Sequence, residues 1–414
     1  MSLRNPEASG RPLKVAMYNV TAAARIGGVE SFVWGASSAL ARLGHEIHIF
    51  TGRGGHLEPH PDGVRVFSYP FLPRHRIPNL GSRFRKLGER LSFAARALPD
   101  VIRERYDVLH IHKPYDLPVA VLAKRFSGVR VMLGCHGRDF FCTDRLWFRC
   151  VDAAVSCSEF NARQVQDRYG VLPAVIYNGI DPEEFRPLPA DTSLREDLGF
   201  RAEEQVILYV GRLIGWKGVS HLIVALNLVV QRRSAVRLLI LGDGEERRNL
   251  ENLGGNLGLS EKIVFAGPVP RARLPRYLAL ADVFVLPSIA DETFGISLCE
   301  AMACGVAAVA TRVGGIPEVA EDRLTGFFTE PGDAAGMAEK ILLLLADPEL
   351  RGRMGREGRQ RVLARFTWDR VARALENEYY NLSKSPSPHA GGRGEPACRA
   401  RGAGRGEGDV RNRT

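Results

Sequence analysis

The sequence has no long apolar run, and this absence argues against a membrane-spanning protein. No stretch approaches the roughly 20 apolar residues that a transmembrane helix needs. The first residues, MSLRNPEASGRPLK, also lack the apolar core of a secretory signal, so we expect a cytoplasmic location. With 414 residues, of which 45% are hydrophobic and 25% charged, the chain can form two to three globular domains.

Cysteine is scarce, and its placement favours neither disulfides nor a zinc site. The seven cysteines include no CxxC pair. Four of them, Cys135, Cys142, Cys150 and Cys157, follow one another at intervals of seven or eight residues, which match no zinc-binding pattern. Reduced thiols in a cytosol are the plain interpretation. No carboxylate pair of the DxD type stands where Mg²⁺ would be required, so we expect no metal and no cofactor.

Acidic residues are outnumbered, which leaves a formal charge of +10. Residues 383–414 carry part of the excess and have almost no apolar side chains, so we expect a disordered tail. Apolar residues from Leu80 to Ile102 recur every three or four positions and predict an amphipathic helix. Two interpretations of its basic face stay open: a solvated surface, or contact with anionic lipid head groups or a phosphorylated acceptor. The cations of this face are Arg83, Arg85, Lys86, Arg90, Arg96 and Arg103.

Short apolar runs alternate with helical patterns over most of the chain, which is typical of a parallel α/β protein. The strands are expected at 13–20, 45–51, 64–69, 108–112, 129–135, 153–156, 206–210, 237–241, 263–266, 283–286 and 306–310. A turn-rich segment that ends near Asp191 is typical of an interdomain linker. We therefore predict two Rossmann-like doubly wound domains, residues 1–185 and 186–365, that face each other across a ligand-binding cleft.

The segment from Pro287 to Gly315 has the strongest signature of a binding site. Glu292 and Glu300 are separated by seven residues, and Gly295 stands between them where a helix is expected to begin. Free N–H groups at a helix start bind anions, and glycine lets a ligand approach the backbone. The two carboxylates can accept hydrogen bonds from sugar hydroxyls. The alternative is that both are solvated surface charges.

Three other strand ends carry residues that suit a phosphate or a sugar. Gly27 and Gly28 follow the first strand and would expose amides at a helix start. Arg212 and Lys217 flank a glycine-rich turn, which suits a diphosphate, although two surface cations would give the same pattern. His136 could hold a sugar hydroxyl, shuttle a proton or simply bond to the backbone.

Taken together, these stretches resemble the retaining sugar-nucleotide glycosyltransferases of family four, which have the GT-B fold. The resemblance spans roughly residues 13–382 in the expected order. It rests on GGVE at 27–30, HGRD at 136–139, NGID at 178–181, GRLIGWKG at 211–218, LGDGEE at 241–246, the pair Glu292 and Glu300, and GGIPEV at 314–319.

The resemblance implies a hexosyltransferase that moves a sugar from a nucleoside diphosphate sugar to an acceptor hydroxyl. The first domain would bind the acceptor and the second the donor, with residues 366–382 crossing back to the first. Arg212, Lys217 and the amides of Gly27 and Gly28 would hold the diphosphate, and Glu300 would bond the ribose.

The same resemblance implies roles around the transferred sugar. Glu292 and the amides of Phe294, Gly295 and Ile296 would grip it. His136 would contact it near the reacting carbon, and Asp139 would lie toward the acceptor. The segment Gly267–Arg271 would meet the nucleobase.

Two other functions stay open at this point. A sugar-nucleotide epimerase would need an acid/base pair, for which His136 and Asp139 are the candidates. A non-catalytic RNA- or membrane-binding protein would use the Arg-rich tail and the basic helix, but it leaves the phosphate-binding turns unexplained. We favour a transferase of cell-envelope glycan synthesis with a glycan or lipid-linked acceptor, no nucleic acid partner, and a location that includes peripheral contact with the inner face of the plasma membrane.

Overall fold

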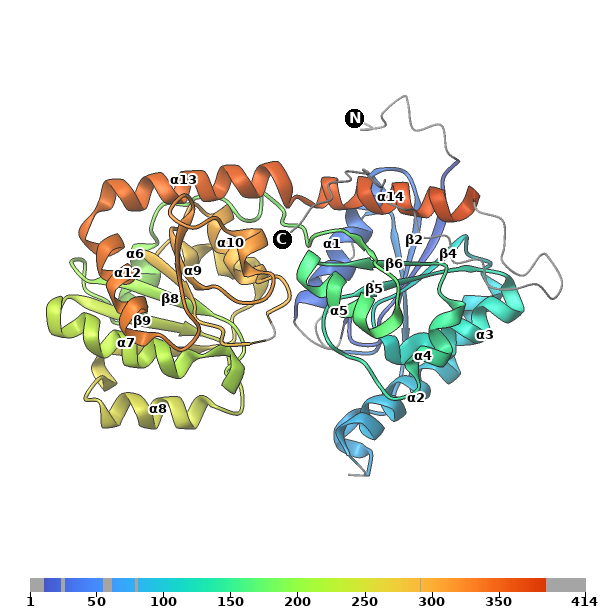
Figure 1. Cartoon of the computed structure of the whole chain (residues 1–414), viewed down its shortest axis with the longest axis horizontal. Helices are drawn as coiled ribbons and strands as arrows, with labels where there is room; N and C mark the ends of the chain where they lie inside the picture. The colour runs from blue at the N-terminus through green and yellow to red at the C-terminus, as the bar shows by residue number, and fades with distance from the viewer. Residues whose placement is uncertain (1–10, 24–26, 55–61, 79–80, 291, 385–414) are drawn as a thin grey trace, which may run out of the picture.

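The computed structural model describes residues 11–23, 27–54, 62–78, 81–290 and 292–384. Two parallel sheets with helices packed around them form the two halves of the molecule (Figure 1). This arrangement confirms the predicted fold class, two doubly wound α/β domains. The tail beyond Lys384 lies outside the described residues, so its predicted disorder stays a prediction.

The first sheet has seven strands in the order β3-β2-β1-β4-β5-β6-β7, all paired in parallel. Alternate residues of β1 enter two different cores, Val15 and Met17 on one face and Ala16 and Tyr18 on the other. Burial on both faces explains why these strands are continuous apolar runs. The strands are β1 (Lys14–Tyr18), β2 (Glu46–Gly52), β3 (Val64–Tyr69), β4 (Val108–Ile111), β5 (Arg130–Cys135), β6 (Ala153–Ser156) and β7 (Ala174–Val175).

The second sheet has six parallel strands in the order β10-β9-β8-β11-β12-β13. The strands are β8 (Gln205–Val210), β9 (Val236–Leu241), β10 (Ile263–Gly267), β11 (Val283–Leu286), β12 (Ala308–Thr311) and β13 (Gly326–Thr329). The edge strands β7 and β13 escaped prediction because β7 has only two residues and β13, GFFT, has only two apolar residues.

The helices of the first half are α1 (Gly28–Arg42), α2 (Ser82–Arg103), α3 (Leu117–Ser127), α4 (Asp144–Trp147) and α5 (Glu159–Tyr169). Those of the second are α6 (Thr192–Asp197), α7 (Val219–Arg232), α8 (Arg247–Asn256), α9 (Leu274–Leu278), α10 (Ile296–Ala303), α11 (Ile316–Val319), α12 (Ala334–Ala346) and α13 (Pro348–Arg365). The last helix, α14 (Trp368–Lys384), follows α13 back to the first half, where Trp368 and Tyr379 join the core beside α1 (Figure 1).

Helix α2 differs from its predicted orientation. Arg90, predicted on the basic face, is buried and forms an ion pair with the buried Asp116 of the first half. Phe84 and Leu91, predicted in the packed stripe, are 47% and 46% exposed. The side that packs on the sheet carries Phe93, Ala97 and Val101, which the prediction left out, together with Ala94, which it included. The prediction was wrong at Arg90 because apolar spacing alone could not reveal that a buried carboxylate compensates its charge.

Candidate active site

The predicted site residues lie around one cleft between the two sheets. The direction of strand order reverses between β1 and β4 in one sheet and between β8 and β11 in the other, which is where doubly wound sheets bind ligands. A cleft of about 730 Å³ opens at the loops that follow these strands. It is lined by every predicted site residue, Gly27, Gly28, His136, Asp139, Arg212, Lys217, Glu292, Phe294, Gly295, Ile296 and Glu300. Their individual roles stay predictions.

The loop before α10 presents the start of that helix to the cleft. Gly295 caps α10 with φ +86°, a left-handed conformation that a side chain would strain. Phe294 anchors the loop, since its ring is buried 5.5 Å from the ring of Phe366. The N–H groups of the first turn therefore form a fixed, partly positive rim on the cleft.

Gly314 and Gly315 support this loop from behind. The sequence had assigned no role to this pair of glycines. Gly315 donates its N–H to the Glu292 carbonyl oxygen at 2.8 Å. Gly314 has φ +59°, and a Cβ there would lie 1.9 Å from the same oxygen. The GGIPEV motif thus fixes the backbone of Glu292, a function that depends on a contact between loops 22 residues apart in the chain.

Lys217 and Glu292 form an ion pair inside the cleft. The Lys217 side chain is 12% exposed and the Glu292 side chain 11%. Ser288 donates its hydroxyl to Glu292 Oε2 at 3.1 Å, which fixes the carboxylate further. Lys217 ends the turn after β8, and Glu292 belongs to the loop after β11, the neighbouring strand. The sheet therefore brings together two residues that are 75 positions apart.

Arg212 differs from Lys217 because no carboxylate neutralises it within the described part of the chain. Its guanidinium lies 5.9 Å from the Trp216 ring, and its side chain reaches the cleft surface. A cation that has no ion pair and is open to solvent is available to an incoming anion.

Glu300 is held on the inner face of α10 by Arg271, a residue that the sequence placed near the nucleobase. The two side chains form an ion pair, and Arg271 Nε also lies 3.3 Å from a carboxylate oxygen of Glu184. Burial raises the pKa of Glu300 above its ordinary value, although the charge of Arg271 opposes this shift. Arg271 therefore keeps a buried carboxylate in a position where it can accept hydrogen bonds.

His136 lies at the end of β5 with its Nε2 atom 3.2 Å from Nδ1 of His112. Burial, with the nearby charge of Lys113, lowers the pKa of His136 to about 3. The ring is therefore neutral at physiological pH, which favours a hydrogen-bonding role over a proton-donating one. His112 was missed by sequence reasoning, which treated residues 108–112 only as a strand.

Asp139 is not free to act as a base toward an acceptor. It forms ion pairs with Lys113 and, at 3.0 Å, with Lys86 of α2. Burial would raise the pKa of Asp139, but the two ammonium groups outweigh it and hold the pKa below its ordinary value. The carboxylate instead ties α2 and the loop after β4 to the HGRD motif.

Three hydrogen bonds join the two halves beside the cleft. Thr293 from the second half donates its hydroxyl to the backbone oxygen of His136 at 3.1 Å. The Glu318 carboxylate accepts the N–H groups of Glu159 and Phe160, at the start of α5, at 2.8 and 2.9 Å. The cleft in this structure is therefore bridged at its rim.

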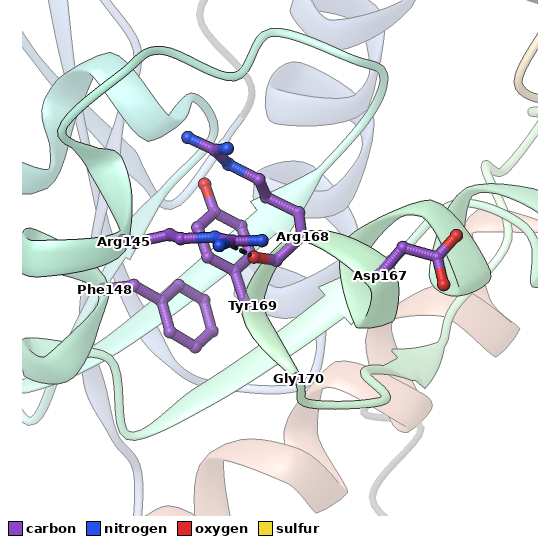
Figure 2. Close-up of a pocket in the computed structure, with 6 residues that line it drawn as sticks. All are labelled: Arg145, Phe148, Asp167, Arg168, Tyr169 and Gly170. Atoms are coloured by element: carbon purple, nitrogen blue, oxygen red, sulfur yellow. Dashed lines mark hydrogen bonds between the residues drawn. The ribbon is translucent and has the colours of Figure 1, made fainter.

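A second hollow, of about 380 Å³, lies on the first half and lacks this chemistry (Figure 2). Phe148 and Tyr169 stack with ring centroids 4.0 Å apart. Arg145 donates to the Arg168 carbonyl oxygen at 2.7 Å, and Arg168 forms an ion pair with Asp144. Arg145 and Arg168 thus already have partners, and Asp167 points away from the other labelled side chains (Figure 2), so these residues do not converge on a ligand.

The described residues contain no group of three or more His, Cys, Asp or Glu that could hold a metal ion. Among the same residues, no helix has both the length and the apolar character needed to cross a bilayer.

Comparison with known proteins agrees with this geometry. The chain is 31% identical over 360 residues to N-acetyl-alpha-D-glucosaminyl L-malate synthase of Bacillus anthracis, covering 83% of this chain and 91% of that one. It is 28% identical over 379 residues to the GDP-mannose-dependent alpha-(1-6)-phosphatidylinositol monomannoside mannosyltransferase of Mycolicibacterium smegmatis, covering 85% and 94%. The structure resembles that of Anabaena HepE in complex with UDP and glucose, with a TM-score of 0.74 and 23% identity over 89% of this chain and 100% of that chain.

Two family models cover most of the chain. Residues 26–184 match the model for glycosyltransferase family 4, and residues 191–361 match the model for glycosyl transferases group 1. The motifs, the fold and these matches lead to one conclusion: the protein is a glycosyltransferase of family four with the GT-B fold.

Proposed function

We propose that the protein moves a hexose-type sugar from a nucleoside diphosphate sugar to an acceptor hydroxyl and retains the configuration at the anomeric carbon. The observation that carries this proposal is the composition of the cleft. Arg212, Lys217 and the start of α10 offer positive charge, and the buried carboxylates of Glu292 and Glu300 flank it. A nucleoside diphosphate sugar presents the hydroxyls of its sugar, then the negative charge of its diphosphate, then the hydroxyls of its ribose, which is the same order.

In the proposed reaction, the bond between the anomeric carbon and the diphosphate oxygen breaks while the acceptor oxygen bonds to the same face. The proton of the acceptor hydroxyl passes to the departing phosphate, so no separate base is required. Arg212, Lys217 and the amides of α10 stabilise the negative charge that develops on the leaving group. We propose that these groups suffice without a metal ion, so a chelator should leave the rate unchanged.

The acceptor is proposed to be a glycan or a lipid-linked molecule of the cell envelope. One relative is named for transfer to a phosphatidylinositol monomannoside, which is a lipid-linked acceptor. On this chain, Phe84 and Leu91 are exposed beside Arg83 on α2, whose end projects from the first half (Figure 1). Apolar and basic side chains together favour peripheral contact with the anionic inner face of a membrane.

The donor is tested by thermal shift with a panel of UDP-, GDP- and ADP-sugars. A donor at 100 times its Kd should stabilise the fold by about 2.7 kcal/mol, and non-binding members of the panel should leave the melting temperature unchanged. The identified donor is then incubated with and without candidate acceptors, and the anomeric configuration of the product is read by NMR. Transfer with inversion would contradict the retaining mechanism.

The same incubations separate the proposal from its rivals. An epimerase would convert the donor into a new nucleotide sugar without any acceptor, whereas a transferase leaves the sugar unchanged or slowly hydrolysed. A non-catalytic RNA-binding protein would bind through residues 383–414, so deleting them would abolish its function. We expect the deletion to leave transfer intact.

A further inference from the structure

Three imidazoles form a row behind the cleft at the ends of β4 and β5. His110 and His112 point to the same face of the sheet because they are two residues apart in the chain, and their ring centroids lie 4.3 Å apart. His136 continues the row, with its centroid 5.4 Å from that of His112. The register pairs Ile111 with Leu133, so the strand ends bring residue 112 close to residue 136.

The row depends on a glycine between the two strands. A Cβ added at Gly134 would lie 2.8 Å from His110 Nε2 and 3.1 Å from both His112 Nδ1 and His136 Nε2. Any side chain at this position would push the imidazoles apart. Glycine is therefore required at position 134 because a side chain has no room there. Its backbone conformation is one that other residues also adopt.

The row is anchored at its inner end by the helix that returns from the second half. Nδ1 of His110 lies 2.8 Å from the hydroxyl of Tyr379 on α14. Phe32 of α1 covers the rings, with its centroid 4.7 Å from that of His136. His136 is thus the one member of the row that lines the cleft.

The contact between His112 and His136 restricts where the proton of each ring can be. Burial lowers the pKa of both imidazoles far enough to keep them neutral at pH 7. A hydrogen bond between two neutral rings requires one nitrogen of the pair to carry the proton and the other to accept it. Neither Nδ1 of His136 nor Nε2 of His112 has a partner among the described residues, so the contact couples the two tautomers. If His112 donates, Nδ1 of His136 is a donor, and if His136 donates, Nδ1 of His136 is an acceptor.

We propose that His112 is a positioning residue, whose hydrogen bond to His136 fixes the ring orientation and the tautomer with which His136 meets the transferred sugar. This inference rests on the proposed function, because it takes the sugar as the group that His136 contacts. The contact with His112 does not depend on a substrate, so it can be tested separately.

The test compares two substitutions of the same residue. The amide of His112→Asn can occupy the place of Nδ1 and keep the hydrogen bond, whereas His112→Phe keeps the ring volume and removes it. We expect kcat to fall about 10- to 100-fold in His112→Phe, with little change in the KM for the donor, and to recover most of this loss in His112→Asn. His48→Phe is the matched control, because His48 is buried in the same sheet and bonds to Tyr106 at 2.7 Å, away from His136.

A spectroscopic measurement on the enzyme without substrate completes the test. With ¹⁵N-labelled histidine, His136 should show a single tautomer in the parent and in His112→Asn, and a mixture of tautomers in His112→Phe. An unchanged His136 signal or an unchanged kcat in His112→Phe would overturn the proposal. If His112→Phe does not fold, His112→Gln replaces it, since its amide reaches the Nε2 position instead. If His112→Phe changes the tautomer of His136 but His136→Ala transfers sugar at the full rate, the role of His136 in the proposed function is refuted, whereas the contact with His112 is not.

Discussion

The two walls of the cleft have the same architecture and opposite chemistry. Each is made of loops at the carboxyl ends of a parallel sheet. The wall of the second half holds charged residues, with Lys217 paired to Glu292 and Arg271 paired to Glu300. At the centre of the other wall lies His136, which is neutral and backed by further imidazoles. The first half also lines the cleft with the charged residues Lys113, Arg138 and Asp139, so its wall is neutral only at the imidazoles, and this part is called the neutral wall below. The charged wall suits an anionic leaving group, and the neutral imidazoles suit an uncharged sugar.

Removing a cation from the charged wall should have the largest effect. We expect Lys217→Ala to lower kcat about 100- to 1,000-fold, because the leaving diphosphate loses a stabilising charge and Glu292 loses its partner. Steady-state rates with the donor found by thermal shift provide the measurement. Lys340→Ala is the control, since Lys340 lies on α12 and pairs with its neighbour Glu339. Near-normal turnover of Lys217→Ala would refute the division of chemistry between the walls.

Acid should weaken the neutral wall. Burial lowers the pKa of His110 to about 3, against about 6.5 in an unfolded chain. Between these values the unfolded state binds a proton that the folded state excludes, so stability is lost as the pH falls from 6.5 toward 3. At pH 5, this histidine should reduce the free energy of unfolding by about 2 kcal/mol relative to pH 8.

The measurement is chemical denaturation at both pH values. His110→Phe should show a smaller loss of stability on acidification than the parent. The exposed His75 provides the control, His75→Phe, which should lose as much as the parent. Equal losses in all three proteins would show that His110 titrates as it does in the unfolded chain.

A milder change to the charged wall tests Glu300. We expect Glu300→Gln to raise the donor KM about tenfold, because the amide is a weaker acceptor than the buried carboxylate. A donor that lacks a ribose hydroxyl should bind equally well to the variant and the parent if Glu300 contacts that hydroxyl. Glu349→Gln, on the exposed start of α13, is the control. If the KM of the deoxy donor also rises about tenfold from the parent to Glu300→Gln, Glu300 does not contact the ribose.

The charged wall was easier to predict from sequence than the neutral one, and the reason is the range of the contacts. The strand that ends at Leu286, the glycine at 295 and the helix that begins at Ile296 lie within about a dozen residues of one another, so local pattern was enough. The partners of the charged residues were not predicted, because Lys217 and Glu292 meet only through the order of β8 and β11. The contact of His112 with His136 likewise depends on the register of two strands, which composition and spacing do not contain.

The smallest effect is expected where the walls touch. Glu318 accepts two N–H groups at the start of α5, so a carboxylate from the second half caps a helix of the first. Glu318→Ala should remove about 1 kcal/mol of this contact and raise the donor KM about fivefold, since bound donor must then supply the free energy of closure that this contact gave. Small-angle scattering should show a larger radius of gyration without donor and the parental value with it.

The matched control for this prediction is Glu321→Ala. Glu321 is also a surface carboxylate after α11, but it pairs with Arg361 within the same half. Both variants lose one acidic side chain, so only Glu318→Ala should change the scattering curve. If neither variant changes the scattering curve, the bridging hydrogen bonds form as a result of cleft closure and do not stabilise the closed state. The spacing of the two walls would then depend on other connections, such as α14 against α1, Cys157 in the core of the second half, and the hydroxyl of Thr293 on the His136 backbone.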